Sequence, residues 1–161
     1  MMKSEILNAL KKPFDPKKIS WRVGATTKDK SKGIALAYID ARDVMHRLDE
    51  VFGMDWQCRY SHADTKTVCE IGVLIDGNWI WRAGGAGDSD IEAEKGALSD
   101  AFKRAAVLFG IGQYLYSIPN NWVELEPKGN SHVIKHVPAL PKWATPEGFD
   151  EIMKQRKERV E

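Results

Sequence analysis

The chain has 161 residues, of which 43% are hydrophobic and 29% are charged, and its formal net charge is +1. This composition is typical of one soluble globular domain with a single core and a tail. No apolar run approaches the ~20 residues that span a bilayer, and lysines interrupt the apolar residues near the N-terminus, so we expect neither a membrane span nor a signal peptide. Cys58 and Cys69 are too few for a disulfide framework, and we expect both thiols to be reduced, as in a cytoplasm.

The first third of the chain is predicted to contain two helices separated by an irregular basic stretch. The predicted elements are a helix over residues 5–11, an extended piece over 34–39 ("IALAYI") and a helix from the Asp40 cap to Phe52. Pro13 ends the first helix. The stretch from Pro13 to Gly33 shows no regular period, and a mobile loop is predicted between Gly24 and Gly33. Gly53 ends the second helix.

Three strands of an antiparallel meander are predicted next, over residues 56–62, 67–75 and 79–84. In the first strand, "WQCRYSH", apolar and polar residues alternate, which predicts that one side of the strand is buried. Asp76-Gly77 predicts the hairpin turn between the second and third strands, because Asp-Gly accommodates positive φ. The glycines of "GGAG" then lead into a long helix over residues 91–109.

The helix segment "KGALSDAFKRAAVLFG", residues 95–110, carries apolar residues at helical spacing. The predicted buried stripe consists of Leu98, Ala101, Phe102, Ala105, Leu108 and Phe109. Lys103 and Arg104 lie on the opposite side, and Gly96 would let another backbone approach the helix. Adjacent cations on a helix are most often a solvated face, so the rest of the chain must decide whether this pair has another role.

These elements predict an α+β fold, in which an antiparallel β-meander packs against a long helix and a second helix precedes the meander. Residues 1–116 form the predicted core domain. Residues 117–161 are expected to form a proline-containing extended tail with little core, which ends in a charged helix over about 147–159 and supplies contacts between subunits.

Positive charge is concentrated in residues 11–32, which contain eight lysine or arginine residues and two aspartates, a net charge of +6. Such a block is often a solvated stretch. Here Phe14, Ile19, Trp21 and Val23 lie between the charges and would anchor the segment to a core. Anchored cations form a fixed positive surface, which is what a phosphate backbone needs. Further candidate cations lie on the predicted strands and the long helix: Arg59, Arg82, Lys103 and Arg104.

Two other patterns were candidates for chemistry. The segment "GGAG" lacks the Gly-Lys-Ser/Thr ending of a P-loop, and an antiparallel meander is the wrong context for a dinucleotide-binding fingerprint. Four carboxylates could hold the metal ion of a nuclease, although acids in the first turn of a helix are expected for its dipole alone: Asp88, Asp90, Glu92 and Glu94. No nucleophile with a general base and no histidine or cysteine pair at metal-ligand spacing is visible. The sequence therefore predicts no catalytic residue, no metal site and no cofactor.

Three segments resemble a known family when they are taken together. "ISWRVG", "AYIDARDVMHRLDEVFGMDW" and "EKGALSDAFKRAAVLFGIG" are similar, in order and spacing, to the single-strand annealing proteins of the Rad52 type, including their small Sak-like phage members. The resemblance covers about residues 12–116. It implies an α+β core that assembles into rings or helical arcs and anneals complementary single strands of DNA without ATP, in recombination or double-strand break repair.

The resemblance also assigns DNA-binding residues by position. Lys103 and Arg104 match the helix cations that line the family's inner DNA groove, and Arg22 matches the arginine of that groove that precedes the Tyr-Ile segment. Lys95 matches a further basic position, and Lys66 falls near a lysine of the outer site. Eukaryotic members have a lysine where this chain has Ala35, and the candidates to replace that charge are Lys30 and Lys32.

The resemblance and the basic residues together predict a non-enzymatic, oligomeric protein that binds and anneals single-stranded DNA, encoded by a phage or prophage and located in the cytoplasm of the bacterial host. Its expected partners are single-stranded DNA, further copies of itself, and a phage exonuclease or a host single-strand binding protein, with no membrane involved. Two alternatives stay open: an interaction module that uses the basic face for an acidic protein, and a metal-dependent nuclease that uses the acidic cluster.

Overall fold

The computed structural model describes residues 2–87 and 91–160, and the chain forms two compact units. The meander unit comprises Met1–Lys12 and Asp40–Gln113, and the hairpin unit comprises Pro13–Ile39 and Tyr114–Glu161. Both units are α+β with antiparallel sheets, which confirms the predicted fold class. Each unit combines segments that are distant in the sequence. The division into an annealing core, residues 1–116, and a tail, residues 117–161, is a functional division and stays a prediction.

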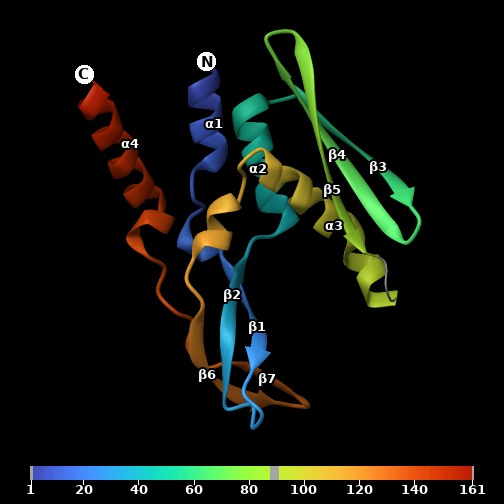
Figure 1. The fold of residues 1–161 in the computed structure, drawn as a ribbon, viewed down its shortest axis with the longest axis vertical. Coiled ribbons are helices and arrows are strands. Elements are labelled where there is room, and N and C mark those ends of the chain that lie inside the picture. Colours follow the sequence, from blue (N-terminus) through green and yellow to red (C-terminus); the bar gives the residue numbers. More distant parts are fainter. Residues whose placement is uncertain (1, 88–90, 161) are drawn as a thin grey trace. The chain divides into compact units, whose positions relative to one another are not determined.

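The meander unit contains three helices and a three-stranded antiparallel sheet in the order β3-β4-β5 (Figure 1). Its elements are α1 (Lys3–Lys11), α2 (Ala41–Phe52), β3 (Trp56–Ala63), β4 (Lys66–Ile75), β5 (Asn78–Gly87) and α3 (Ile91–Leu108). Asp40 caps α2, because its carboxylate accepts a hydrogen bond from the backbone N–H of Arg42 at 2.8 Å. Asp76 and Gly77 both have positive φ in the turn between β4 and β5, as predicted.

The core of the meander unit lies between β4 and the helices α2 and α3. Alternate residues of β4 face α3 and are fully buried, including Cys69, Ile71 and Val73. Phe102 of α3 and Leu48 of α2 are also buried, and the Phe102 ring lies 6.1 Å from that of Trp56. A rigid sheet and one apolar helix stripe therefore fix the orientation of α3.

Arg47 is a buried charge that fastens α1 to α2. Its Nη1 donates hydrogen bonds to the backbone carbonyls of Ala9, Leu10 and Lys12 at 3.1, 3.1 and 2.7 Å. These carbonyls end α1, where a helix leaves its acceptors without intrahelical partners and carries the negative end of its dipole. No local sequence pattern distinguishes Arg47 from the exposed charged residues of the same helix.

Two predictions about the meander unit are wrong. The "GGAG" segment is part of β5 and not a loop before the helix. Leu98 and Leu108 are about half exposed, because the buried stripe of α3 is rotated toward its alanines, which let the helix approach β5 closely. The stripe that is buried consists of Ala97, Ala101, Phe102, Ala105, Ala106 and Phe109.

The outer strand of this unit also differs from expectation. The predicted buried side of β3 is largely exposed, at Cys58, Tyr60 and His62, because α3 packs against β4 and β5 and leaves this outer strand uncovered. At Gly96 an added Cβ would meet nothing nearer than the Asp100 carboxylate at 3.9 Å, so the approach of another backbone there stays a prediction. Within the described part of the chain, a close approach to α3 occurs at Gly84 of β5.

The hairpin unit contains a four-stranded antiparallel sheet in the order β1-β2-β6-β7 and a terminal helix (Figure 1). Its strands and helix are β1 (Ser20–Thr26), β2 (Lys32–Tyr38), β6 (Asn121–Lys128), β7 (Ser131–Ile134) and α4 (Pro146–Val160). Its short 3-10 turns are η1 (Pro16–Lys18) and η3 (Lys142–Ala144). A further turn, η2 (Gln113–Ser117), lies where the chain passes from the meander unit to the hairpin unit. Ala35 of β2 and Leu125 of β6 are buried on one face of the sheet. Phe14 and Ile19 are also buried in this unit.

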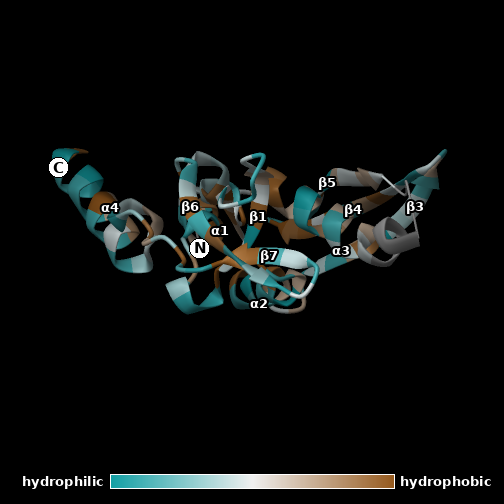
Figure 2. Cartoon of the chain, turned by 90° about the horizontal axis from the view of Figure 1, so that it is seen from below, coloured by the Kyte–Doolittle hydropathy of each residue, from teal (hydrophilic) through white to brown (hydrophobic). Residues whose placement is uncertain are grey.

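The predicted irregular stretch and the predicted tail join in this sheet. Residues 13–33 contain β1, so the prediction of an irregular segment is wrong there, and residues 27–31 form a compact hairpin turn. β6 belongs to the predicted tail and pairs with β2, so this part of the tail is a strand of the sheet. The terminal helix is confirmed as α4, which is mostly hydrophilic with a few apolar positions (Figure 2). None of the described helices is long and apolar enough to cross a membrane.

Candidate nucleic-acid interface

Lys103 and Arg104 lie off the buried stripe of α3, with the Cβ of Arg104 at the edge of the contact with Gly84 of β5. Arg104 is exposed, and the Lys103 side chain is 28% exposed, with its Nζ 3.9 Å from the Asp100 carboxylate one turn earlier. That ion pair is weak at this distance and exposure. Because Phe102 and Ala105 are buried on either side of the pair, the sheet fixes the direction in which both cations point.

Gly84 determines how closely α3 approaches the sheet at this point. A Cβ on Gly84 would lie 2.3 Å from the backbone nitrogen of Ala105 and 2.7 Å from the carbonyl carbon of Arg104. Only glycine fits this contact, so a strand glycine positions the two cations of the facing helix. The segment "GGAG" thus has a structural role at the site.

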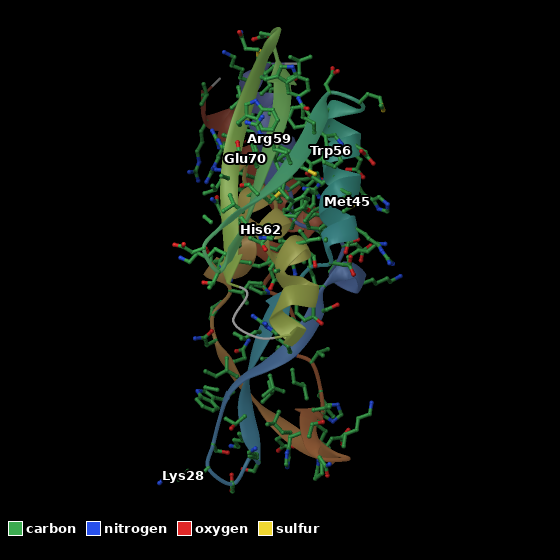
Figure 3. All side chains as sticks on the ribbon, turned by 90° about the vertical axis from the view of Figure 1, so that its right-hand side faces the viewer. Lys28, Met45, Trp56, Arg59, His62 and Glu70 are labelled. Carbon is green, nitrogen blue, oxygen red and sulfur yellow. The ribbon has the colours of Figure 1, made fainter. Side chains whose placement is uncertain are left out.

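Two other arginines of the meander unit are engaged by protein groups. The guanidinium of Arg82 donates to the backbone carbonyl of Leu108 at the C-terminal end of α3 and lies 4.9 Å over the Phe109 ring. Arg59 donates from Nη2 to the Glu70 carboxylate at 3.0 Å and stacks 4.1 Å from the Trp81 ring, and Figure 3 shows it beside Glu70. These contacts make Arg82 and Arg59 less available to a ligand than Arg104.

The second group of cations lies on the β1–β2 hairpin of the hairpin unit. Its members are Arg22 on β1, Lys28 and Lys30 in the turn, and Lys32 at the start of β2, all exposed. Figure 3 shows Lys28 at the tip of the hairpin.

Asp29 holds the turn between these lysines in one conformation. Its Oδ1 accepts hydrogen bonds from the Thr27 hydroxyl at 2.8 Å, the Ser31 hydroxyl at 2.8 Å and the Ser31 backbone N–H at 3.0 Å. The hydrogen bonds from Ser31 and Thr27 lower the pKa of Asp29 to about 2. By charge alone Asp29 is only an opposing residue of the basic block, but the pattern Thr-x-Asp-x-Ser is a local signal for such a turn.

The strand register brings Arg22 and Lys32 to the same face of the sheet. Arg22 pairs with Leu36 across the β1–β2 ladder, and Lys32 precedes Leu36 by four residues on β2. Residues paired directly in an antiparallel ladder share a face, as do alternate residues along a strand. Ala35 points to the opposite, buried face and is 5% exposed, so this chain has no room for a lysine there.

The remaining predicted residues are placed less completely. Lys66 is exposed at the first position of β4, paired with Ala63 and Gly87. Lys95 lies within α3, but its side chain is outside the described part of the structure. The predicted acidic cluster also lies outside the described part: Asp88 and Asp90 entirely, and Glu92 and Glu94 with their side chains. Elsewhere in the described residues, no group of histidine, cysteine or carboxylate side chains could hold a metal ion.

The structure therefore assembles two sets of cations, each within one unit. Lys103 and Arg104 are adjacent on α3 of the meander unit, whereas Arg22 and Lys32 share a sheet face of the hairpin unit, with Lys28 and Lys30 in the adjoining turn.

Comparisons with known proteins agree on one family. The model of the Rad52/22 family of double-strand break repair proteins matches residues 3–133. The single-stranded DNA-binding protein DdrA of Deinococcus radiodurans is 36% identical over 150 residues, which cover 91% of this chain and 71% of that protein. DdrA of Deinococcus deserti is 36% identical over 149 residues, which cover 91% of this chain and 73% of that protein. No solved structure matches.

Proposed function

Because the chain belongs to the Rad52/22 family of double-strand break repair proteins, we propose that it binds single-stranded DNA and anneals complementary strands in recombination and repair. The observation that carries the proposal is the pair Lys103 and Arg104, exposed or partly exposed on a helix whose other side is fixed to a sheet. Because the helix is already fixed to the sheet, binding a phosphate backbone here does not require the main chain that carries these cations to become ordered.

The proposed mechanism requires positive charges at fixed positions, and it requires no residue that forms or breaks a covalent bond. The cations hold the phosphates of one strand, which leaves its bases accessible to a complementary strand. Base pairing then supplies both the specificity and the free energy of annealing, so neither ATP nor sequence readout by the protein is required. We place Arg22, Lys30 and Lys32 in the same function, with Lys66 and Lys95 as further phosphate contacts.

Assembly into a ring or arc is part of the proposal. The 24 lysine and arginine residues of the chain are nearly balanced by 23 acidic residues, and only a few of them belong to the two sets described above, so a single copy offers a strand few phosphate contacts. Repeating Lys103 and Arg104 along an assembly would supply a continuous row of phosphate contacts. The protein partners that fit this function are an exonuclease that produces single strands and a single-strand binding protein that covers them.

An annealing assay tests the proposal directly. Two complementary labelled oligonucleotides are mixed with the protein in EDTA and without nucleotide, and duplex formation is followed over time. We expect faster annealing than without protein, and strand binding that weakens steeply with salt, by a log–log slope of about −0.7 for each phosphate neutralised. No binding of DNA would favour the interaction module instead, and cleavage of the strands on addition of Mg²⁺ would favour the nuclease.

A further inference from the structure

One face of the hairpin unit sheet combines cations with exposed aromatic rings. We call it the Arg22 face, and the register assigns to it Arg22, Lys32, Ile34, Leu36, Tyr38, Trp122 and Glu124. The opposite face is buried at Ala35 and Leu125. A sheet with one face on the core presents its other face to solvent or to a ligand.

Trp122 is the largest exposed side chain of this face. It is 54% exposed, although a tryptophan is usually buried for most of its area. It pairs with Ile34 of β2 on one side. On the other side, β7 pairs with residues 125–128 of β6, and the backbone N–H of Lys135 donates to the Glu124 carbonyl at 3.0 Å, so the described pairing stops two residues short of Trp122. The indole ring lies beyond this pairing and is about half exposed at the edge of the Arg22 face.

The cations of the face lie close to this ring. Lys32 is a diagonal neighbour of Trp122 across the β2–β6 ladder, and Arg22 lies two strands away, which corresponds to a backbone separation of about 12 Å at ordinary strand spacings. A strand that passes over the ring can therefore reach both cations within a few nucleotides. Glu124 follows Trp122 by two residues on β6 and is the direct partner of Lys32 on the same face, whereas Arg22 has no acidic partner in the β1–β2 ladder.

We propose that Trp122 is a base-stacking residue, on which single-stranded DNA lays one base while Arg22 and Lys32 hold the adjoining phosphates. The proposal rests on the proposed function and deepens it, because it names a contact to the bases and not to the backbone. Base–aromatic stacking is independent of sequence, since every base has a π-face, and so it suits a protein that must accept any strand. Trp122 also belongs to the predicted tail, which thereby gains a role in DNA binding.

The experiment compares two probes that differ only in their bases. Labelled oligo(dT) and an abasic strand of the same length are titrated with wild-type protein and with Trp122→Ala, Trp122→Phe and Trp143→Ala. We expect Trp122→Ala to weaken binding of oligo(dT) about tenfold and to leave binding of the abasic strand unchanged. Trp122→Phe should restore most of the affinity, and Trp143→Ala, a change at an exposed tryptophan of η3, should behave as wild type.

A second variant tests the path of the strand. Glu124→Gln removes a negative charge beside the ring, so it should tighten the binding of both probes if the strand passes over Trp122. Equal loss of both probes in Trp122→Ala, or a change of its oligomeric state in light scattering with unaltered oligo(dT) binding, would overturn the proposal and assign this surface to folding or to a second copy of the chain. Failure of the proposed function is a different result, in which wild-type protein neither binds nor anneals oligonucleotides.

Discussion

Arginine side chains of the meander unit have different roles, according to what they contact. Arg47 is buried and binds three backbone carbonyls at the end of α1, and Arg82 binds one at the end of α3. Arg59 is held between a carboxylate and an indole ring. Arg104 has no such contact with any described residue and is exposed. The residue type alone does not distinguish a structural arginine from a candidate DNA contact, because the difference lies in acceptors that tertiary structure brings near.

Replacing the helix cations tests their role most directly. Lys103→Ala and Arg104→Ala should each weaken binding of single-stranded DNA about tenfold, which corresponds to the loss of one charge-assisted hydrogen bond, and the double variant should not anneal. Stability should be unchanged, because both side chains lie off the buried stripe and alanine favours the helix. Titration of a labelled strand gives the affinity, and thermal unfolding gives the stability.

Two controls separate loss of contact from loss of fold. Lys154→Ala removes an exposed lysine from another helix, α4, and should leave binding unchanged. Phe102→Ala removes a ring that is 1% exposed, which typically costs ~3–5 kcal/mol, so it should lower the Tm before any binding defect can be interpreted. Wild-type binding and annealing by the Lys103/Arg104 double variant would show that this pair is an ordinary solvated face.

Asp29 gives the basic hairpin a pH dependence of known sign. Its pKa is lowered from 3.8 to about 2 by hydrogen bonds from Ser31 and Thr27, so the folded turn favours the ionised carboxylate. The resulting stabilisation of the turn is fully present above pH 3.8 and is lost as the pH falls through about 2. NMR titration of the Asp29 carboxyl carbon should give a midpoint near 2. A midpoint near the ordinary value of 3.8 would mean that the turn is not formed in solution.

Local sequence signals predicted the helices better than the sheets. Caps, stop glycines and the Asp-Gly turn are set by neighbouring residues, and α1, α2, α3 and α4 lie close to their predicted ranges. The pairing of β2 with β6 joins segments about ninety residues apart, for which a short apolar run carries no information. Leu98 and Leu108 fit a helical period but are exposed, because the alanines beside them allow a closer contact with β5.

The close contact between β5 and α3 depends on Gly84 and not on its neighbour Gly85. At Gly84 an added Cβ would lie 2.3 Å from the Ala105 nitrogen, whereas at Gly85 it would meet nothing nearer than 3.6 Å. Gly84→Ala should therefore displace α3, lower the Tm by several degrees and weaken DNA binding, because overpacking a core contact typically costs ~1–3 kcal/mol. Gly85→Ala should fold and bind as wild type. Equal Tm values for the two variants would contradict the close contact.

At the scale of the whole molecule, the order and spacing of motifs were more informative than composition. A net charge of +1 gives no indication of a nucleic-acid partner. The three motif segments nevertheless predicted the family that matches residues 3–133. Arg22, Lys95, Lys103 and Arg104 were assigned by their positions in those motifs. The base-stacking candidate Trp122 lies beyond them, and the pairing of β1, β2 and β6 relates it to Arg22. Assembly depends on surfaces that one chain does not define.

The last prediction concerns that assembly. If annealing requires many cations in register, the protein should form a ring or arc of several copies, and half-exposed apolar side chains such as Leu98 and Leu108 are available for the contacts between them. Light scattering and electron microscopy should show one discrete oligomer without DNA. Dilution below the assembly concentration should then reduce annealing more than the binding of a short oligonucleotide, because a single copy retains its own few cations but loses the continuous row. A monomeric protein that anneals at full rate would contradict the requirement for assembly.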